Sequence, residues 1–279
     1  MWPEPEDHRT VLRMRAAHAR ACAAFDLTLP QEAPEIWGWH GRTIAAQVLG
    51  ASGPAWLRVA HAARDQIIGT FWTGAVEAHQ HMPPSIPRPG LHRWQDWTDG
   101  RWAYRAELHD HVTAGTVSDC AAITDQPALP GRWWADVRAA LDAIAAVRTH
   151  RLTIQPGFLT WAMPRYLGIL HADYAGIPWM TAHGDFHFAN LCAPRLSILD
   201  WEGWGLAPPG YDAATLHAYS LREPETALNI RHELSHLFST EAGRYAELAV
   251  ITELLHFAAE GSHPEMTEAL RQRAAVILK

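Results

Sequence analysis

The pattern of apolar and polar positions divides the chain into a β-rich first part and a helical second part. Apolar residues recur at helical spacing over residues 10–25, and short runs typical of strands follow them. A second helical pattern, over 69–81, interrupts these runs. The first part therefore predicts a mostly antiparallel sheet with one helix before it and one within it. The predicted strands cover residues 35–37, 43–49, 55–60, 91–97 and 102–107.

Most of the later pattern predicts helix. Long segments with helical periodicity cover 133–150 and 159–170, and from Tyr211 to the end helices are interrupted only by expected breaks. The exception is 181–205, where a polar loop, the short apolar run 196–199 and a second loop predict loop, strand and loop. The expected breaks lie near Pro224, Gly243 and Gly261. We therefore predict an α+β protein with a β-sheet lobe over 1–108 and a mainly helical lobe over 109–279.

Composition excludes several classes of protein. The chain has 279 residues, of which 48% are hydrophobic and 19% charged, and this is typical of a globular protein with a sizeable core. No apolar run approaches the ~20 residues of a membrane span, and the N-terminal MWPEPEDHRT lacks the apolar centre of a signal peptide. We expect a cytoplasmic protein without a membrane partner.

Negative charge is concentrated in the second part of the chain. Residues 171–279 contain 14 acidic and 7 basic residues, whereas residues 1–170 contain 16 of each. An acidic surface argues against nucleic acid as a partner, because phosphates repel it. It is compatible with a small cationic partner.

Three polar residues in 181–205 have a spacing that suits phosphoryl transfer. Asp185 and Asn190 lie in the polar loop, and Asp200 follows the short apolar run, so a tight hairpin would bring them together. An aspartate can orient an attacking hydroxyl and accept its proton, while an asparagine and a second aspartate hold Mg²⁺ on the nucleotide phosphates. Magnesium needs only one or two protein oxygens.

The segments HGDFHFAN and ILDWEGWGLAPPGYDAA resemble the aminoglycoside phosphotransferase and choline kinase family of small-molecule kinases. The resemblance is specific over 181–214 and implies a two-lobed protein-kinase-like fold. It implies that Asp185 is the catalytic base and that Asn190 and Asp200 bind the metal. His183 and Asp212 would support the site structurally.

The same resemblance implies a cation on the α- and β-phosphates, contributed by the third strand. The family has lysine there, but the single lysine of this chain is Lys279, and the third predicted strand carries Arg58. Arginine keeps the charge and presents a planar fork, so the exchange is not conservative. Glu77, on the following predicted helix, is the expected ion-pair partner of Arg58.

Two further segments complete the predicted nucleotide site. Gly38, Gly41 and Arg42 belong to a loop between the first two predicted strands, which could close over phosphates. Glu107 and His109 lie in 107–111, where the last predicted strand ends and the resemblance implies a hinge that contacts adenine through its backbone.

The resemblance implies transfer of phosphate from ATP, or GTP, to a hydroxyl of a small polar molecule, with Mg²⁺. Candidate acceptors are an aminoglycoside or related antibiotic, a sugar or an amino alcohol, and the acceptor can be cationic. Trp201, Glu202 and Trp204 flank the metal aspartate and could line the acceptor pocket. The protein would act as a monomer or homodimer.

Two alternatives stay open. A catalytically inactive kinase-like binding protein is favoured if Arg58 cannot serve the phosphates. A zinc hydrolase is suggested by the H-E-x-x-H pattern of His232, Glu233 and His236, which would place two zinc ligands and a general base on one helix.

Overall fold

The computed structural model describes residues 2–67, 69–174 and 176–279. The chain forms two compact units, Met1–Gln80 with Arg88–Gly115 and His81–Pro87 with Thr116–Lys279. Among the described residues, no helix is both long and apolar enough to cross a membrane.

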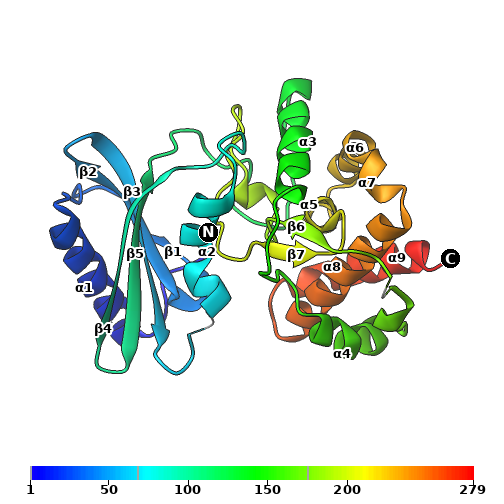
Figure 1. The fold of residues 1–279 in the computed structure, drawn as a ribbon, viewed down its shortest axis with the longest axis horizontal. Coiled ribbons are helices and arrows are strands. Elements are labelled where there is room, and N and C mark those ends of the chain that lie inside the picture. The colour runs from blue at the N-terminus through cyan, green and yellow to red at the C-terminus, as the bar shows by residue number, and fades with distance from the viewer. Residues whose placement is uncertain (1, 68, 175) are drawn as a thin grey trace. The chain divides into compact units, whose positions relative to one another are not determined.

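The first unit is an antiparallel sheet with strand order β1-β2-β3-β5-β4 (Figure 1). This confirms the predicted five-stranded sheet. Strand β3 extends beyond its predicted range at both ends, and β5 extends beyond its predicted range at the C-terminal end. The helical segment predicted over 69–81 is present as α2 (Gly69–His81). The strands are β1 (Ile36–Trp37), β2 (Thr43–Gly50), β3 (Gly53–Ala63), β4 (Leu91–Asp99) and β5 (Trp102–Asp110).

The two faces of this sheet differ in character, as expected for an antiparallel sheet. The apolar side chains of β3 and β5, such as Leu57 and Ala106, form a core with α1 (His8–Phe25). The alternate positions carry Arg58, which is opposite Glu107 in the register of the two strands. Helix α1 begins two residues earlier than predicted because Asp7 caps it, accepting backbone N–H groups of the first turn.

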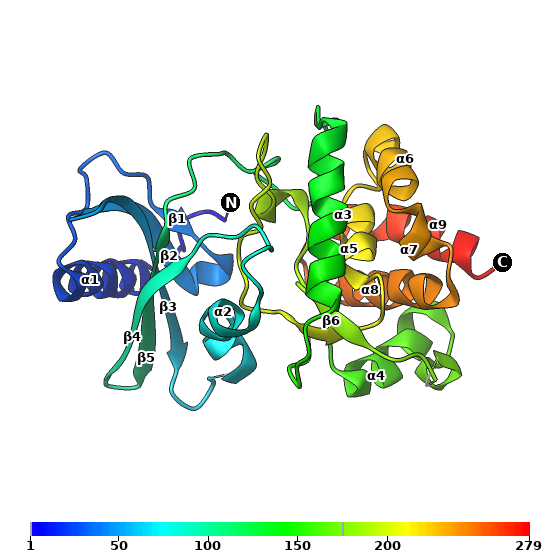
Figure 2. The same cartoon turned by 45° about the horizontal axis from the view of Figure 1, so that its top comes forward.

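The second unit is helical, apart from a two-stranded antiparallel sheet of β6 (Met180–Ala182) and β7 (Gly205–Ala207). Helix α8 is buried along much of its length and packs against α4, α5 and α9, while α3 runs beside β6 (Figures 1 and 2). The helices are α3 (Gly131–Ala145), α4 (Pro156–Leu167), α5 (Tyr211–Tyr219), α6 (Pro224–Glu233), α7 (Ser235–Phe238), α8 (Glu241–Ala259) and α9 (Thr267–Ile277).

The break predicted near Gly243 occurs just before this residue, at 239–240 between α7 and α8. Gly243 lies in the first turn of α8, where its N–H donates to Oγ1 of the capping residue Thr240. A Cβ at position 243 would lie 1.9 Å from the carbonyl oxygen of Leu237. This glycine therefore allows close packing of the preceding turn and does not interrupt the helix.

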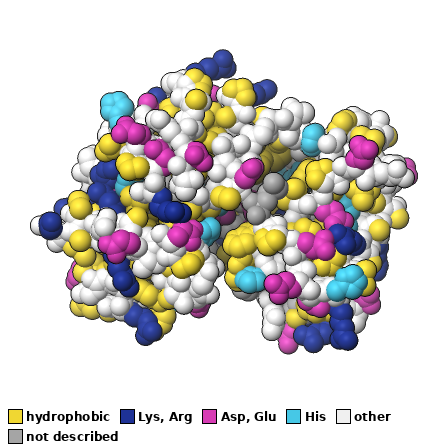
Figure 3. Space-filling view, turned by 180° about the vertical axis from the view of Figure 1, so that it is seen from behind, with side chains coloured by type: hydrophobic (Ala, Val, Ile, Leu, Met, Phe, Trp, Pro, Cys, Tyr) yellow, Lys and Arg dark blue, Asp and Glu magenta, His cyan; other side chains and the backbone are white. Residues whose placement is uncertain are grey.

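Charged side chains of both signs are interspersed with hydrophobic ones on the face shown in Figure 3. On that face the acidic excess of the sequence does not form one patch.

Candidate functional site

The approach to the predicted catalytic loop is fixed by a buried carboxylate. β6 leads into His183 and Gly184, whose backbone N–H groups donate to the two carboxylate oxygens of Asp212 at 2.7 and 2.9 Å. Asp212 lies in the first turn of α5 and is 5% exposed. Burial and the nearby charge of Asp185 raise the pKa of Asp212 to about 6, although the two N–H groups oppose the shift. Helix α5 thus anchors the start of the loop.

The Asp185 carboxylate is held from two sides by its own loop. His187 Nε2 lies 3.1 Å from Asp185 Oδ1, and Asn190 Nδ2 donates to Oδ2 at 2.9 Å. The side chain of Asp185 nevertheless remains 49% exposed. Burial opposes ionisation, but His187, His183 and Asn190 outweigh it and lower the pKa of Asp185 to about 2. The carboxylate is therefore ionised, oriented and open to a second molecule.

His187 was not among the residues selected from the sequence. Burial alone would lower the pKa of His187, but the charge of Asp185, a hydrogen bond to it and the charge of Asp200 raise it overall. Its position two residues after Asp185, within the same motif, is a signal that could have identified it.

Leu199 links the catalytic loop to Asp200. Its backbone N–H donates to the carbonyl of Asn190 at 2.8 Å, and its own carbonyl accepts from His183 Nε2 at 2.8 Å. Because Nδ1 of His183 accepts the N–H of Asp185, the ring is the neutral Nε2–H tautomer. Burial lowers the pKa of His183 to about 4, which agrees with a neutral ring.

Asp200 is exposed and has a left-handed backbone, with φ 57°. The strand predicted before it is not formed as a regular strand. Leu196 and Ile198 are buried, but within the described part of the chain the bridge between Ile198 and Leu191 is an isolated one and belongs to no regular strand. The chain reverses direction at 193–195, so the segments 190–192 and 197–199 are too short to form more than a few backbone hydrogen bonds with each other.

A carboxylate of α8, which sequence analysis did not select, lies near Asp185. The hydroxyl of Tyr211 donates to Glu253 Oε2. Burial and the charge of Asp185 raise the pKa of Glu253 to about 7, while the hydrogen bond from Tyr211 opposes the rise. Tyr219, whose ring packs edge-on against His187 at 5.2 Å, also has a raised pKa from burial and from both carboxylates. Glu253 is 68 residues from Asp185, and only the fold brings it close.

Glu253 predicts a pH dependence of stability. Its pKa is higher in the folded chain than in the unfolded chain, so the folded state binds the extra proton between about pH 4.5 and 7. The contribution of Glu253 to the unfolding free energy therefore falls as pH rises through this window, by about 3 kcal/mol at most. Glu253→Gln removes the ionisation, so thermal unfolding should show a larger gain in Tm over wild type at pH 8 than at pH 4.5.

The exposed Glu241, in the first turn of the same helix, provides the control for this prediction. Glu241→Gln should leave the pH dependence of Tm close to that of wild type. Equal pH profiles for Glu253→Gln and wild type would contradict a raised pKa at Glu253.

Arg58 and Glu107 form an ion pair within the first unit. Arg58 Nη1 lies 3.3 Å from Glu107 Oε2, and the Glu107 side chain is 3% exposed. His109 Nε2 lies 3.5 Å from the same oxygen. Burial opposes ionisation of Glu107, but His109 and Arg58 outweigh it and lower its pKa. The structure thus gives Arg58 a carboxylate partner on the neighbouring strand, while the expected pairing with Glu77 of α2 stays a prediction.

The position of Glu107 differs from that of a hinge residue. The hinge was expected after the last strand, but β5 continues to Asp110 and pairs with β3 and β4 on its two sides at Glu107. The backbone at Glu107 is therefore engaged in the sheet, and we correct its expected role to that of side-chain partner of Arg58. His109 is the second-last residue of β5.

The glycine loop is internally bonded. Gly41 N–H donates to the carbonyl of Gly38 at 2.9 Å, and Arg42 N–H donates to that of Trp39 at 3.0 Å. A Cβ at Gly38 would lie 2.1 Å from Oγ1 of Thr43. Close packing in this conformation therefore explains why glycine occupies these positions. The phosphate contact predicted for the loop stays a prediction.

The two tryptophans beside Asp200 serve packing. Trp201 is 5% exposed and donates its Nε1–H to the carbonyl of Ile198, and Trp204 is 0% exposed. Neither indole has an open face for an acceptor, which corrects the expectation for both. Glu202 is partly exposed.

The H-E-x-x-H segment lacks the continuous helix that its zinc chemistry requires. α6 ends at Glu233 and α7 begins at Ser235, so His232 and His236 are in different helices. The Glu233 carboxylate pairs with Arg138. Among the residues that the structure describes, no group of three or more His, Cys, Asp and Glu side chains could hold a metal ion. The segment offers no support for a zinc hydrolase.

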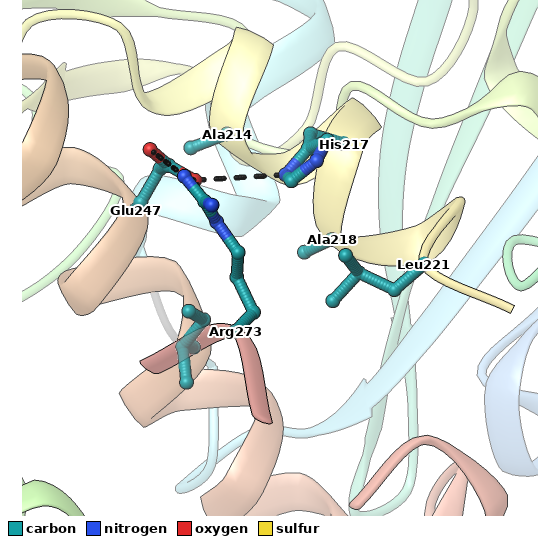
Figure 4. Close-up of a pocket in the computed structure, with 7 residues that line it drawn as sticks. Ala214, His217, Ala218, Leu221, Glu247 and Arg273 are labelled. Atoms are coloured by element: carbon teal, nitrogen blue, oxygen red, sulfur yellow. Dashed lines mark hydrogen bonds and ion pairs between the residues drawn. The ribbon is translucent and has the colours of Figure 1, made fainter. Parts of the chain in front are cut away.

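A second group of buried charges lies along α8. Glu247, which is 2% exposed, pairs with Arg273 at 2.7 Å, and His217 Nδ1 lies 3.6 Å from its carboxylate (Figure 4). Arg231 also pairs with Glu247, at 3.1 Å. Burial, together with the two arginines, lowers the pKa of His217 to about 3, so the imidazole is neutral. These contacts join α5, α6, α8 and α9, so we interpret the group as one that stabilises the packing of these helices.

Comparison with known proteins identifies the fold. No protein-family model matches the chain, and no curated protein matches it in sequence. Solved structures do match it over nearly its whole length. A spectinomycin phosphotransferase, solved with ADP and spectinomycin, has a TM-score of 0.58 and 13% identity, over 92% of this chain and 93% of that one.

Two further structures have similar scores. A microcompartment-associated aminopropanol kinase has a TM-score of 0.55 and 12% identity, over 94% of this chain and 95% of that one. A candidate aminoglycoside phosphotransferase from Ralstonia eutropha has a TM-score of 0.52 and 12% identity, over 97% and 96%. The predicted α+β, protein-kinase-like architecture is thus confirmed, and the chain has the fold of the small-molecule phosphotransferases.

Proposed function

We propose that the protein is a small-molecule kinase that transfers the terminal phosphoryl group of ATP, or GTP, to an alcohol hydroxyl. The observation that carries this proposal is the Asp185 carboxylate, which is ionised, held by His187 and Asn190, and half-exposed. Phosphoryl transfer depends mainly on positioning and charge stabilisation, and a fixed carboxylate can align an attacking hydroxyl and accept its proton.

Magnesium fits the neighbouring donors. Asn190 uses Nδ2 to bond Asp185, so its amide oxygen is not engaged in that bond, and Asp200 adds an exposed carboxylate. Two hard oxygens are the usual protein contribution to a Mg²⁺ site, with phosphates and water supplying the rest. We therefore assign Asn190 and Asp200 to the metal, which would neutralise charge on the phosphates. Leu199, bonded on both sides, sets their relative position.

The nucleotide contacts are assigned to the first unit. Arg58 supplies the positive charge for the α- and β-phosphates, Glu107 orients its guanidinium, and Glu77 is proposed as a second carboxylate partner. The loop of Gly38, Gly41 and Arg42 and the strand end at His109 complete this assignment. The second unit provides the catalytic and acceptor residues.

A cationic acceptor is supported by the carboxylates around Asp185. Glu253 lies close enough to Asp185 for the two charges to interact, and its pKa of about 7 lets it ionise when a positive charge binds beside it. Glu202 is a further candidate beside the metal aspartate. Aminoglycosides, amino sugars and amino alcohols combine a hydroxyl with an ammonium group, and they are the acceptors that we propose.

Nucleotide consumption over a panel of aminoglycosides, sugars and amino alcohols tests this function. ADP should form only when Mg²⁺ and a suitable acceptor are both present. Binding of nucleotide without consumption for any acceptor would favour the inactive binding protein.

Substitutions at Arg58 should separate its contribution to stability from its contribution to nucleotide binding. Arg58→Ala leaves Glu107 buried without this charge partner, so it should both destabilise the chain, by about 3–5 kcal/mol, and weaken nucleotide binding. The double variant Arg58→Met with Glu107→Gln removes both charges and should recover much of the stability without recovering nucleotide affinity. Arg58→Lys should keep part of the affinity.

Thermal unfolding and calorimetric titration of ATP with Mg²⁺ measure the two properties separately. Wild-type nucleotide affinity in the double variant would mean that Arg58 does not contact phosphate, and Arg42 would be the next candidate.

A further inference from the structure

Two side chains of the segment 151–153 hold three successive carbonyl groups of the loop after Asp200. Arg151 donates from Nη2 to the carbonyl of Glu202 at 3.1 Å and from Nε to that of Trp204 at 2.9 Å. Thr153 Oγ1 donates to the intervening carbonyl of Gly203 at 3.0 Å. The conformation of this loop is therefore determined by side chains some fifty residues earlier in the chain.

The two backbones are also joined. Leu206 N–H donates to the carbonyl of Arg151 at 2.8 Å, Thr153 N–H donates to that of Leu206 at 3.0 Å, and Leu152 forms a parallel bridge with Leu206. A Cβ at Gly205 would lie 2.7–2.8 Å from backbone atoms of 151–153. Glycine at this position allows the two segments to approach each other, and together these contacts make a continuous brace.

Because Arg151 is buried, its side chain has a strong preference for the hydrogen bonds of this brace. The residue is 8% exposed, and its guanidinium lies 4.8 Å from the ring centre of Trp204, which is fully buried. A buried guanidinium is costly unless its N–H groups are satisfied, so its bonds to the loop carbonyls are strongly favoured. Lysine could not reproduce them, because it lacks the planar fork.

The brace contacts both the loop that carries Asp185 and the loop that carries Asp200. A Cβ at Gly184, beside Asp185, would lie 2.8 Å from Cγ2 of Thr153 and 2.9 Å from the carbonyl oxygen of Gly203. Asp200 thus lies between two fixed stretches, Leu199 on one side and residues 202–206 on the other. Its left-handed φ of 57° is uncommon for a residue other than glycine, and these anchors maintain it.

We propose that Arg151 and Thr153 are positioning residues, which set the Asp200 carboxylate in the geometry that Mg²⁺ requires. This inference rests on the proposed function, because it concerns the metal-dependent part of nucleotide binding. Groups that orient a metal ligand typically change metal affinity or activity about 10–100-fold when they are removed. Loss of one contact from the brace should therefore raise the Mg²⁺ requirement about 10-fold without changing metal-free nucleotide binding.

Conservative variants test the brace without unfolding the chain. Arg151→Lys keeps the charge and loses the fork, Thr153→Val keeps the shape and loses the hydroxyl, and Thr153→Ser restores the hydroxyl. Matched controls are Arg132→Lys on α3 and Thr160→Val on α4, both at exposed positions. ADP binding is titrated by calorimetry over a range of Mg²⁺ concentrations, and hydrogen exchange of the 200–206 amides is measured on the protein without ligand.

We expect Arg151→Lys and Thr153→Val to raise the Mg²⁺ concentration for half-maximal ADP affinity about 10-fold. They should also accelerate exchange at 200–206, whereas Thr153→Ser and both controls resemble wild type. Faster exchange with an unchanged Mg²⁺ requirement would overturn the positioning role and leave the proposed function intact, and unchanged exchange would overturn the brace itself. Failure of the wild type to bind ADP with Mg²⁺ would instead overturn the proposed function, and with it the role of the brace in metal binding.

Discussion

Asp185→Asn should lower phosphoryl transfer about 10²–10⁴-fold, the usual contribution of a positioned general base. The variant keeps an oxygen that can accept from Asn190, so the loop should retain its shape. It loses the charge that attracts His187 and the capacity to accept the hydroxyl proton. Nucleotide affinity and Tm should change little, because the proposed metal ligands and the Asp212 anchor are untouched.

Steady-state turnover and calorimetric nucleotide binding measure these effects on the same preparation. The exposed Asp142 of α3 provides the control substitution, Asp142→Asn. Turnover of Asp185→Asn within a few-fold of wild type would remove this residue from the catalytic role.

Asp200→Asn should reduce turnover about 10³-fold, since a metal ion contributes several kcal/mol to transition-state stabilisation. Asparagine tolerates the left-handed backbone of this position, so the change removes charge without forcing the loop into another conformation. Unlike Asp185→Asn, this variant should also weaken nucleotide binding, and only when Mg²⁺ is present.

The two aspartates are therefore distinguished by one comparison. Nucleotide affinity measured with and without Mg²⁺ should respond to the metal in Asp185→Asn and hardly at all in Asp200→Asn. A full Mg²⁺ response in Asp200→Asn would show that another group holds the metal. Asp136→Asn, at an exposed position of α3, controls for loss of surface charge.

Elements with a clear period were predictable from the sequence, and those set by packing were not. The segment 69–81 forms the predicted helix because its apolar spacing is unbroken. The break predicted near Gly243 occurs at 239–240, but the pattern does not show that Gly243 itself lies inside the next helix, in contact with Leu237. Local sequence does not reveal which carbonyl will lie against a glycine.

The same division holds in the site. Asp185, Asn190 and Asp200 were found because motif and chemistry coincide over a short stretch. Glu253 and Arg151 were missed because each lies about fifty residues or more from the groups it affects, and each lies in a segment that resembles ordinary helix or loop. Glu107 was assigned to a hinge because the last strand was expected to end earlier than it does.

The most direct test of the central claim is the chemical product. Wild-type protein, ATP, Mg²⁺ and each amine-containing alcohol of the panel are incubated together, and the acceptor is analysed by mass spectrometry and ³¹P NMR. The account predicts a phosphate monoester on a hydroxyl, formed with wild type and with Asp142→Asn but not with Asp185→Asn. Absence of a phosphorylated acceptor across the panel, or equal product from Asp185→Asn, would contradict it.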